Sequence, residues 1–300
     1  MLVTLAIFGC SDGAPSVLDT AELDPVDSAT PSDTDDPDHT DDPLPPTTLK
    51  VVGWNLESGD SQLSTLVEQL RAVEGEAIWG LSEVSEETWA EALAEVADDE
   101  GDPWSYVLGT TGGADRLAIL YDPEVVALRS SEELDDINVG GTVRAPLVAH
   151  FRLKGSGEEL LFMVNHLWRT FEEGRHQQAE LLNTWGAEQV LPVVAVGDYN
   201  FDWAVEGGED DHDAGYDRMT ADGVWTWVRP LELVETQCSS YDGVLDFTFV
   251  TEPALAWGGR STILHTEEGA DCTDDDRSSD HRPVDAVFGI SSDRGSTPGG

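Results

Sequence analysis

Short apolar runs alternate with amphipathic segments from about residue 49 to residue 290. Apolar runs of about four to eight residues bounded by polar ones are typical of buried strands. By this pattern the sequence predicts strands at 49–56, 77–83, 117–121, 147–153, 160–167, 193–196, 245–250 and 284–288. Both continuous and alternating strand patterns occur, as in sheets that pack on one or both faces.

Three amphipathic segments between these runs predict helices. In the first, leucine and valine recur on one helical face from Leu63 to Val73, after a capping Asp60 or Ser61. The second begins at Ser85, and the third covers roughly 177–189. Many strands with few helices indicate sheets covered by helices in one α/β or α+β domain.

The first 48 residues have a different composition. Residues 11–48 contain eleven acidic residues among Pro, Ser and Thr, and neither Lys nor Arg. Such a segment cannot bury a core and predicts a disordered, extended tether. Residues 291–300 predict a polar tail, so the folded domain is expected at 49–290.

Residues 1–10 form a short apolar run that ends in Ile7-Phe8-Gly9-Cys10. The run is too short to span a bilayer, and it resembles the end of a bacterial lipoprotein signal, in which the Cys becomes acylated. We therefore expect an exported protein that is anchored to a membrane through Cys10, in the periplasm or at the cell surface. A secreted protein with a free or buried Cys10 is the alternative.

The charge excludes one class of function. The chain has 15 basic against 61 acidic side chains, a net charge of -46, and only two lysines, Lys50 and Lys154. The eleven acids of the tether account for -11, which leaves -35 on the rest. Proteins that coat nucleic acid neutralise phosphates with Lys and Arg, so that role is excluded. The 39% hydrophobic content with ten Trp nevertheless predicts a sizeable core.

Six predicted elements end in, or run into, polar residues that a core would not favour. They are Asn55, Glu83, Asn165-His166, Asp198 with Asn200, Asp246, and Asp280-His281. Singly, each has an ordinary explanation as a turn, a cap or a packed histidine. Together, at strand ends, carboxylates, amides and two histidines indicate a hard-cation site flanked by acid–base groups.

The content and order of these motifs resemble the endonuclease/exonuclease/phosphatase superfamily, which has the DNase I-like fold. The matching motifs are Asn55, Leu81-Ser-Glu83-Val84, Arg116-Leu-Ala-Ile-Leu-Tyr121, Asn165-His166-Leu167, Gly197-Asp198-Tyr199-Asn200, Leu245-Asp246-Phe247 and Ser279-Asp280-His281-Arg282-Pro283. The resemblance covers about residues 49–290. It implies an α+β fold, a four-layer α/β/β/α sandwich with two mixed sheets packed face to face and helices outside.

The resemblance also implies a divalent cation, with Mg²⁺ first and Mn²⁺ or Ca²⁺ as alternatives. Glu83 is the expected main ligand, and Asn55 and Asp280 contribute directly or through water. Mg²⁺ needs few protein oxygens because it keeps several waters, which agrees with this small set.

By the same resemblance, His281 is the general base or the charged group beside the attacked phosphorus, and Asp246 accepts a hydrogen bond from its other ring nitrogen. Asp198 orients or deprotonates the attacking water. Asn200 and His166 donate to the phosphate, while Asn165 next to His166 points to the other face as a structural residue.

Two arginines and one aromatic residue complete the expectations for the site. Arg116 either reaches the substrate phosphate or forms a surface ion pair, and Arg175 braces the third helix against the loop after His166. Tyr199 stands where this motif commonly has Phe, and the ring is kept.

The remaining chemistry lies in cysteines and in the insert at 206–230. Cys238 and Cys272 are an even pair in an exported chain and predict a disulfide, with a metal site as the weaker alternative. The acidic cluster at 209–213 is expected to be a solvated loop rather than a Ca²⁺ site. Trp225 and Trp227 share one face if they lie in a strand, either packed in the core or exposed to substrate.

The leading hypothesis is therefore a metal-dependent hydrolase of phosphodiesters or phosphomonoesters. A nuclease ranks second, because the acidic surface repels DNA unless cations screen it. A sphingomyelinase ranks third, since no exposed aromatic hairpin is evident. A noncatalytic binding protein on the same fold is the alternative from another class. The expected partners are a phosphoester (a small molecule, lipid headgroup or nucleic acid) and a membrane; no protein partner is implied.

Overall fold

The computed structural model describes residues 47–71, 73, 76–97, 103–238, 243–266 and 277–290. Segment 1–10 with Cys10, residues 11–46 of the predicted tether, the tail 291–300 and Cys272 lie outside the described residues. Lipidation, export and the Cys238–Cys272 disulfide therefore stay predictions. Within the described ranges, no helix has the length and apolar character needed to cross a membrane.

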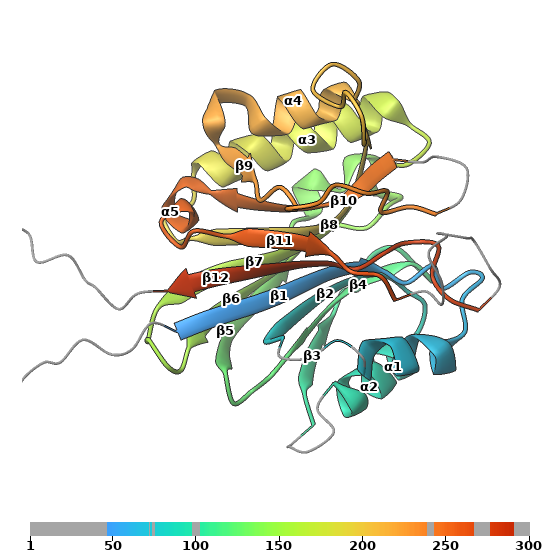
Figure 1. Cartoon of the computed structure of the whole chain (residues 1–300), viewed down its shortest axis with the longest axis vertical. Coiled ribbons are helices and arrows are strands. Elements are labelled where there is room, and N and C mark those ends of the chain that lie inside the picture. Colours follow the sequence, from blue (N-terminus) through green and yellow to red (C-terminus); the bar gives the residue numbers. More distant parts are fainter. Residues whose placement is uncertain are drawn as a thin grey trace, which may run out of the picture. The chain divides into compact units, whose positions relative to one another are not determined.

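The first sheet contains six strands: β1 (Thr47–Asn55), β2 (Ile78–Val84), β3 (Ser105–Leu108), β4 (Arg116–Tyr121), β11 (Arg260–Ile263) and β12 (Val284–Ile290). Their order across the sheet is β11-β12-β1-β2-β4-β3 (Figure 1). β1 and β2 are parallel, and the other neighbouring pairs are antiparallel. The sheet is thus mixed, with a parallel pair near its centre.

The second sheet also has six strands: β5 (Val126–Glu133), β6 (Leu147–Leu153), β7 (Glu159–His166), β8 (Val193–Ala204), β9 (Trp225–Trp227) and β10 (Gly243–Thr251). They are ordered β5-β6-β7-β8-β10-β9. Here β7 and β8 form the parallel pair, and the remaining pairs are antiparallel.

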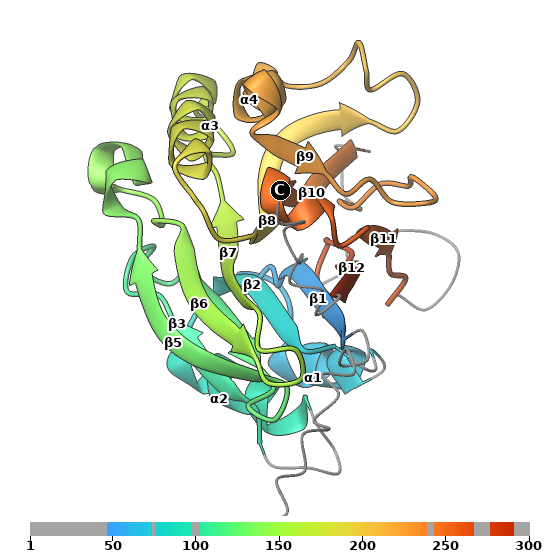
Figure 2. The same cartoon turned by 90° about the vertical axis from the view of Figure 1, so that its left-hand side faces the viewer.

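Helices lie outside both sheets. α1 (Leu63–Arg71) and α2 (Glu87–Val96) lie beside the first sheet, and α3 (Glu172–Ala187) and α4 (Ala214–Thr220) lie beside the second (Figures 1 and 2). The short elements are α5 (Glu252–Leu255), η1 (Asp135–Ile137), η2 (Val139–Gly141) and η3 (Ala221–Gly223). The predicted four-layer sandwich with two mixed sheets is confirmed.

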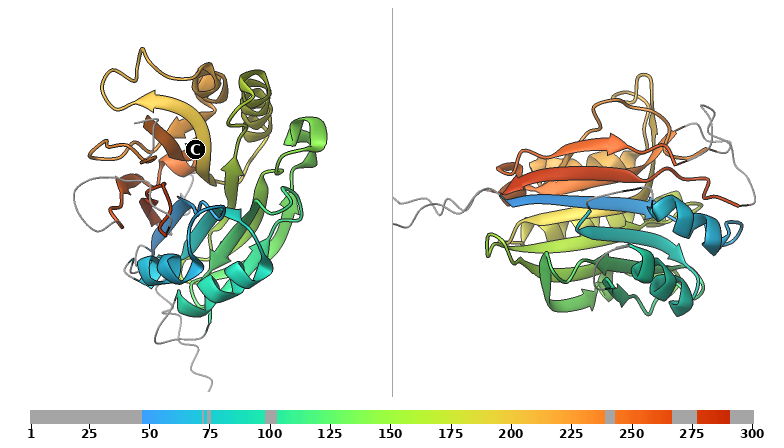
Figure 3. Two further views of the ribbon diagram at one scale, coloured as in Figure 1. Left: turned by 90° about the vertical axis from the view of Figure 1, so that its right-hand side faces the viewer. Right: turned by 60° about the horizontal axis from the view of Figure 1, so that its bottom comes forward.

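Apolar side chains fill the three spaces between these layers. One cluster, which includes Ile119, Phe162 and Val196, lies between the sheets, and the other two lie under the helix pairs. The sheets stack face to face in the views of Figure 3. Glycine lies where the two sheets meet: a Cβ on Gly80 of β2 would come within 2.4 Å of the Val196 Cγ2 atom. The small residue therefore sets the spacing of the sheets at this point.

The observed elements extend the predicted ones. α3 begins at Glu172, five residues before the predicted start, and β8 continues to Ala204. β1 already includes Thr47 and Thr48, which the sequence assigns to the tether. The cap of α2 is Glu86 rather than Ser85, and it makes no side-chain capping bond.

The tryptophan pair in the insert belongs to the core. Trp225 and Trp227 lie in β9 and are 1% and 9% exposed. Trp225 stacks on Trp185 of α3, and its indole N–H donates to the Leu182 carbonyl at 3.0 Å. The exposed, substrate-facing alternative is therefore wrong for this pair.

Candidate active site

Strand pairing brings the predicted polar residues together at one end of the sandwich, where several central strands end. Asn55 ends β1 and is in register with Ser82 of β2, the residue before Glu83. In the other sheet, Asp198 of β8 is in register with both His166 of β7 and Asp246 of β10. A hydrogen bond of 3.1 Å from Asn55 Nδ2 to Asp198 Oδ2 joins the two sheets at this edge.

Glu83 departs from regular strand geometry. Its φ is +57°, in the left-handed region that favours glycine, and the β2–β4 register shifts between Leu81 and Val84. A bulge of this kind redirects a side chain out of the normal alternation. As a result the Glu83 side chain is half-buried, with Oε1 3.8 Å from His166 Nε2 and 25% of its area exposed.

Asp246 and His281 form a buried pair. His281 Nδ1 lies 2.7 Å from Asp246 Oδ2, and both side chains are almost fully enclosed. Burial by itself lowers the pKa of His281. The charge of Asp246 and the hydrogen bond to it, with the charges of Asp198 and Asp280, outweigh burial and raise that pKa above the usual range. Asp246 therefore orients His281 and favours its protonated form.

Asp198 lies between the two histidines. Its Oδ2 is 3.4 Å from His166 Nε2 and 3.9 Å from His281 Nε2, and its Oδ1 accepts the backbone N–H of Asn200 at 3.0 Å. Burial raises the pKa of Asp198, and the charge of His281 offsets only part of that effect. A carboxylate with a raised pKa is a stronger base than an ordinary aspartate.

Asn55 donates hydrogen bonds to two carboxylates of the candidate site. Its Nδ2 group donates to Glu83 Oε1 and to Asp198 Oδ2, both at 3.1 Å. Its Oδ1 accepts the backbone N–H of Glu57 at 3.0 Å, which fixes the orientation of the amide. Asn55 therefore positions two carboxylates, while its expected part in metal binding stays a prediction.

Asp280 is held beside His281 by two neighbours. Its Oδ2 accepts from Gln237 Nε2 at 2.6 Å, and its backbone N–H donates to Glu57 Oε2 at 2.7 Å. Its Oδ1 lies 3.7 Å from His281 Nε2. Glu57, with φ of +48°, is a carboxylate of this region that the strand-end pattern does not identify.

His166 has two partners that the sequence does not reveal. Arg144 Nη2 lies 2.5 Å from His166 Nδ1, and Arg144 Nη1 pairs with Asp115 Oδ2 at 2.9 Å. Burial, and then the positive charges of Arg144, His281 and Arg169, hold the pKa of His166 well below its usual range. Because the guanidinium is a donor only, the neutral ring accepts at Nδ1 and presents Nε2–H towards Asp198 and Glu83.

Asn200 and Asn165 differ as expected in their surroundings. Asn165 Nδ2 donates to the hydroxyl of Tyr199 at 2.9 Å inside the second sheet's helix-side core, so Asn165 is structural. Asn200 has φ of +52°, and its Nδ2 donates to the Leu167 carbonyl at 3.3 Å. A side-chain amide carries two N–H donors, so one remains for a ligand.

The two arginines that the sequence pattern identifies lie in different places. Arg116 begins β4 and its Nη2 donates to the Ser85 carbonyl at 3.4 Å, close in sequence to Glu83. Arg175 Nη1 donates to the carbonyls of Trp168 and Arg169, so it braces the start of α3 as predicted. Its Nη2 also pairs with Asp213 at 2.6 Å, which shows that this member of the acidic cluster is buried and paired rather than solvated.

The donor set fits a hydrated divalent cation. Glu83, Asp115 and His166 offer one ligand atom each, and these atoms lie within 4.8 Å of one another. Arg144 already engages Asp115 and His166 of this group, so Glu83 is the better oxygen donor of the three. One or two carboxylates suit Mg²⁺, which retains several waters.

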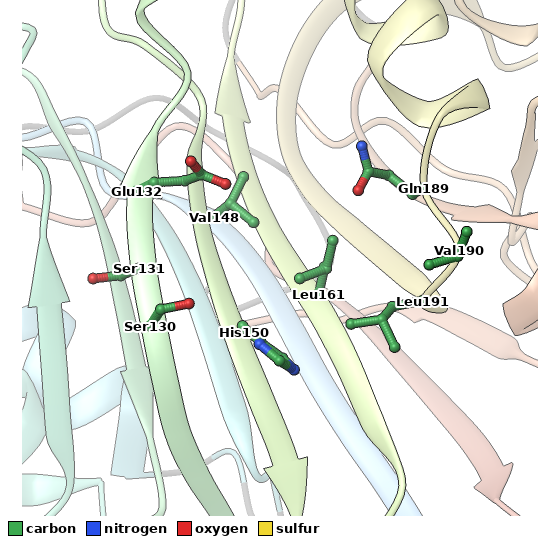
Figure 4. A pocket seen from close by; sticks show the side chains of 9 residues that line it. All are labelled: Ser130, Ser131, Glu132, Val148, His150, Leu161, Gln189, Val190 and Leu191. Atoms are coloured by element: carbon green, nitrogen blue, oxygen red, sulfur yellow. The ribbon is translucent and has the colours of Figure 1, made fainter.

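A hollow on another face of the molecule contains none of these residues. Ser130, Val148, His150 and Leu161 on β5–β7 line it together with residues 189–191, and its volume is about 270 Å³ (Figure 4). His150 pairs there with Glu159 at 3.1 Å. This histidine is therefore a useful comparison for the two histidines of the site.

The chain resembles solved structures in fold but matches no protein-family model and no curated protein by sequence. D. rerio TDP2 complexed with a single-strand DNA product superposes with a TM-score of 0.62 at 17% identity, over 81% of this chain and 99% of that one. An endonuclease/exonuclease/phosphatase family protein from Bacteroides thetaiotaomicron gives 0.59 at 20% identity, over 82% and 98%. A mannosyl-6-phosphatase from the same species gives 0.58 at 20%, over 79% and 98%.

These comparisons establish the fold. The described residues between 47 and 290 have the DNase I-like fold of the endonuclease/exonuclease/phosphatase proteins, as the motifs at the strand ends predict.

Proposed function

We propose that this protein is a divalent-metal-dependent phosphoesterase that hydrolyses its substrate by attack of water on phosphorus. The observation that carries the proposal is the buried Asp246–His281 pair facing Asp198, with Glu83 joined to Asp198 through the amide of Asn55. A fold core alone does not need three carboxylates and two histidines enclosed at one edge, because burying charge is costly. The neighbours of the same fold include a phosphatase, which agrees with this class of reaction.

Asp198 and His281 have different roles in the proton chemistry. Asp198, with its raised pKa, takes a proton from the attacking water. His281 stays protonated because of Asp246, so it stabilises negative charge on the phosphoryl oxygens rather than acting as the base. Of the two roles expected for His281, the geometry and charge favour the second.

Hydrogen-bond donors on the opposite wall bind the phosphate, with two arginines close by. His166 presents an N–H, and Arg144 and Arg169 act on it electrostatically at close range. Asn200 adds one amide N–H. These donors match the several acceptor oxygens of a phosphoester.

Glu83 and Asp280 would hold the cation, with Asn55 orienting Glu83. Mg²⁺ is the first choice, and Mn²⁺ and Ca²⁺ are the alternatives. When bound, the cation supplies positive charge that offsets the charge of the transferring phosphoryl group and of the leaving oxygen.

The charge of the molecule ranks the substrates. The net charge of -35 outside the tether disfavours a long polyanion, so a small phosphodiester or phosphomonoester ranks first. Nucleic acid ranks second, and the single-strand DNA product held by the D. rerio TDP2 structure is the observation that keeps it in the ranking.

The test is hydrolysis of bis(4-nitrophenyl) phosphate and 4-nitrophenyl phosphate by the full chain with MgCl₂. We expect His281→Gln and Asp198→Asn to lower kcat/KM by a factor of about 100 or more, as loss of an acid–base or charged group does. His150→Gln, at the histidine outside the site, should hydrolyse at the wild-type rate.

Equal rates for the wild type and His281→Gln, with both proteins folded by circular dichroism, would contradict the proposal. No hydrolysis of either ester or of supercoiled plasmid would favour the noncatalytic alternative. Nicking of plasmid that is lost in His281→Gln would move the nuclease to first place.

A further inference from the structure

Glu133, the last residue of β5, binds a loop of the other sheet with both carboxylate oxygens. Oε2 accepts the backbone N–H of Thr110 at 2.9 Å and the Thr110 hydroxyl at 2.5 Å. Oε1 accepts the same two groups of Thr111, at 3.0 Å and 2.6 Å. The two threonines lie in the loop 109–115 between β3 and β4 of the first sheet, whereas β5 is an edge strand of the second. One side chain thus joins the two sheets through four hydrogen bonds.

These four bonds stabilise the ionised form of Glu133. Burial alone would raise the pKa of Glu133, but the hydrogen bonds from Thr110 and Thr111 outweigh it and lower that pKa. Hydrogen bonds to an ionised acceptor are stronger than those between neutral groups. Charged side chains on edge strands ordinarily face water, so a half-buried carboxylate with this many donors indicates that Glu133 holds the loop in place.

The loop that Glu133 holds also contacts the segment that carries Arg144. The Thr111 hydroxyl, which donates to Glu133, accepts the backbone N–H of Ala145 at 2.9 Å. Gly112 has φ of +91°, and a Cβ at this position would lie 3.2 Å from Arg144 Cβ. The loop backbone therefore passes close to Arg144, and a displacement of Thr111 would disturb the main chain next to this arginine.

The same loop ends at Asp115, the partner of Arg144. Arg144 Nη1 pairs with Asp115 Oδ2 at 2.9 Å, and Arg144 Nη2 lies 2.5 Å from His166 Nδ1. Arg144 is thus fixed at both ends, its main chain through the bond of the next residue to the loop and its guanidinium through Asp115. Both connections lead through the loop to Glu133.

We propose that Glu133 is a positioning residue for His166. By fixing the loop 109–115, it keeps Arg144 where its guanidinium donates to His166 Nδ1. The ring then keeps its proton on Nε2, the nitrogen that faces Asp198 and Glu83. Glu133 acts only through the loop and Arg144. The catalytic part of this inference rests on the proposed function, whereas the protonated position of the His166 ring does not.

The first test is NMR of the full chain with isotopically labelled histidine, because nitrogen chemical shifts report which ring nitrogen carries the proton. The signals of His166 are those that His166→Gln removes. We expect the Nε2–H form in the wild type and a mixture with the Nδ1–H form in Glu133→Gln. A glutamine has one acceptor oxygen, so two of the four donors lose their acceptor and the loop shifts.

Glu132→Gln is the matched control, since Glu132 is the exposed neighbour of Glu133 on β5. It should keep the wild-type signals of His166. An Nδ1–H form in the wild type, an unchanged ring in Glu133→Gln, or an equal change in Glu132→Gln would overturn the proposal. Each of these results is independent of whether the protein hydrolyses an ester.

Thr111→Val breaks the same connection from the side of the loop, and it replaces Glu133→Gln in both tests if that variant does not fold by circular dichroism. Thr111→Ser keeps the hydroxyl and is its control. We expect Glu133→Gln and Thr111→Val to lower kcat/KM for bis(4-nitrophenyl) phosphate about 5- to 20-fold, and Thr111→Ser to stay close to the wild type.

A double-mutant cycle distinguishes positioning from a merely structural effect. In an Arg144→Lys background, Glu133→Gln should lower kcat/KM by less than about twofold more, because both substitutions act through the same bond to His166. Fully additive losses would overturn the proposal. No hydrolysis by the wild type would contradict the proposed function alone, and the NMR signals of His166 would then decide whether Glu133 positions the ring.

Discussion

Glu57, Glu83 and Asn200 hold their backbones at positive φ, although none of them is glycine. Such conformations cost on the order of 1 kcal/mol each and persist only where the surroundings enforce them. Here the surroundings are hydrogen bonds: the Asn55 amide donates to Glu83, the Asp280 backbone N–H donates to Glu57, and the Asn200 backbone N–H donates to Asp198. These hydrogen bonds thus hold the strained backbones in place and fix the arrangement of the carboxylates.

Arg144 provides a residue-scale prediction. It bonds to His166 Nδ1 with one nitrogen and to Asp115 with the other, which a lysine ammonium cannot reproduce in the same geometry. We expect Arg144→Lys to lower kcat/KM for bis(4-nitrophenyl) phosphate roughly 10- to 100-fold, the equivalent of one charge-assisted hydrogen bond.

The control for Arg144→Lys is Arg152→Lys. Arg152 lies on β6 and donates to the Gly157 carbonyl in the exposed turn between β6 and β7, at the opposite end of these strands from His166. Unchanged kinetics in Arg144→Lys, or an equal loss in both variants, would count against a role for Arg144 in positioning His166.

The sequence predicts much of the site because its residues follow strands in a fixed order. Arg144 and Asp115 escape that reasoning, since each lies in a loop before a strand, where no hydrophobic period marks it. The strand pattern points to Arg116, yet its neighbour Asp115 is the side chain that approaches His166. Which of two adjacent residues faces a site depends on loop geometry that a single sequence does not contain.

At the scale of elements, the two sheets depend on glycine where they meet. A Cβ on Gly80 would approach Val196 Cγ2 to 2.4 Å and Val164 Cγ2 to 2.7 Å. Gly80→Ala should therefore lower the free energy of unfolding by about 1–3 kcal/mol, the usual cost of overpacking a core. The measurement is urea unfolding followed by Trp fluorescence.

Gly289→Ala is the matched control for Gly80→Ala. Gly289 also lies in a strand, β12, but it is exposed and its nearest added contact is 3.8 Å away. The urea midpoint of the Gly289→Ala variant should stay close to that of the wild type. A loss as large as that of Gly80→Ala would show that strand glycines matter here for a reason other than sheet contact.

A buried ion pair connects α3 and α4. Asp213 accepts from the backbone N–H of Gly215 as the cap of α4, and it pairs with Arg175 and His176 of α3. Burial alone would raise the pKa of Asp213, but the hydrogen bonds from Arg175 and Gly215 outweigh it and lower that pKa below the ordinary value of an aspartate. A lowered pKa in the folded state stabilises the protein above the unfolded pKa, and the contribution is lost as pH falls through the folded value.

Asp213→Asn should therefore destabilise the protein by about 2–3 kcal/mol near neutral pH, since it leaves Arg175 without its buried partner. The difference from wild type should stay constant from neutral pH down to about pH 5 and shrink at lower pH. Urea unfolding of both proteins across this range tests the prediction. A difference that grows on acidification would contradict the assigned direction.

Three strands at the edges of the sheets are not predicted from the sequence, because they are short or partly polar. β3 and β11 have four residues each, and β5 carries Arg, Ser and Glu in its second half. Edge strands need few apolar residues because one side has no neighbouring strand. The long central strands can be predicted from the sequence, because burial on both faces requires continuous apolar runs.

At the scale of the whole molecule, the acidic surface opposes the basic groups of the site. The body carries -35, while Arg144 and Arg169 lie near His166 among the described residues. A small phosphoester experiences mainly the local positive field once inside the site. A nucleic acid strand extends beyond it and experiences the acidic surroundings as well.

This difference predicts different salt dependences for two substrates. Raising the ionic strength from about 0.01 M to about 0.15 M shortens the Debye length from about 30 Å to about 8 Å, which screens repulsion between exposed charges. At fixed MgCl₂, kcat/KM for a single-stranded oligonucleotide should therefore rise with NaCl, while that for bis(4-nitrophenyl) phosphate should change little. Nucleases with basic surfaces behave in the reverse way, because salt weakens their phosphate contacts. A fall in oligonucleotide cleavage with added salt would mean that a basic path for the strand outweighs the net charge, and it would place nucleic acid above small phosphoesters as the substrate.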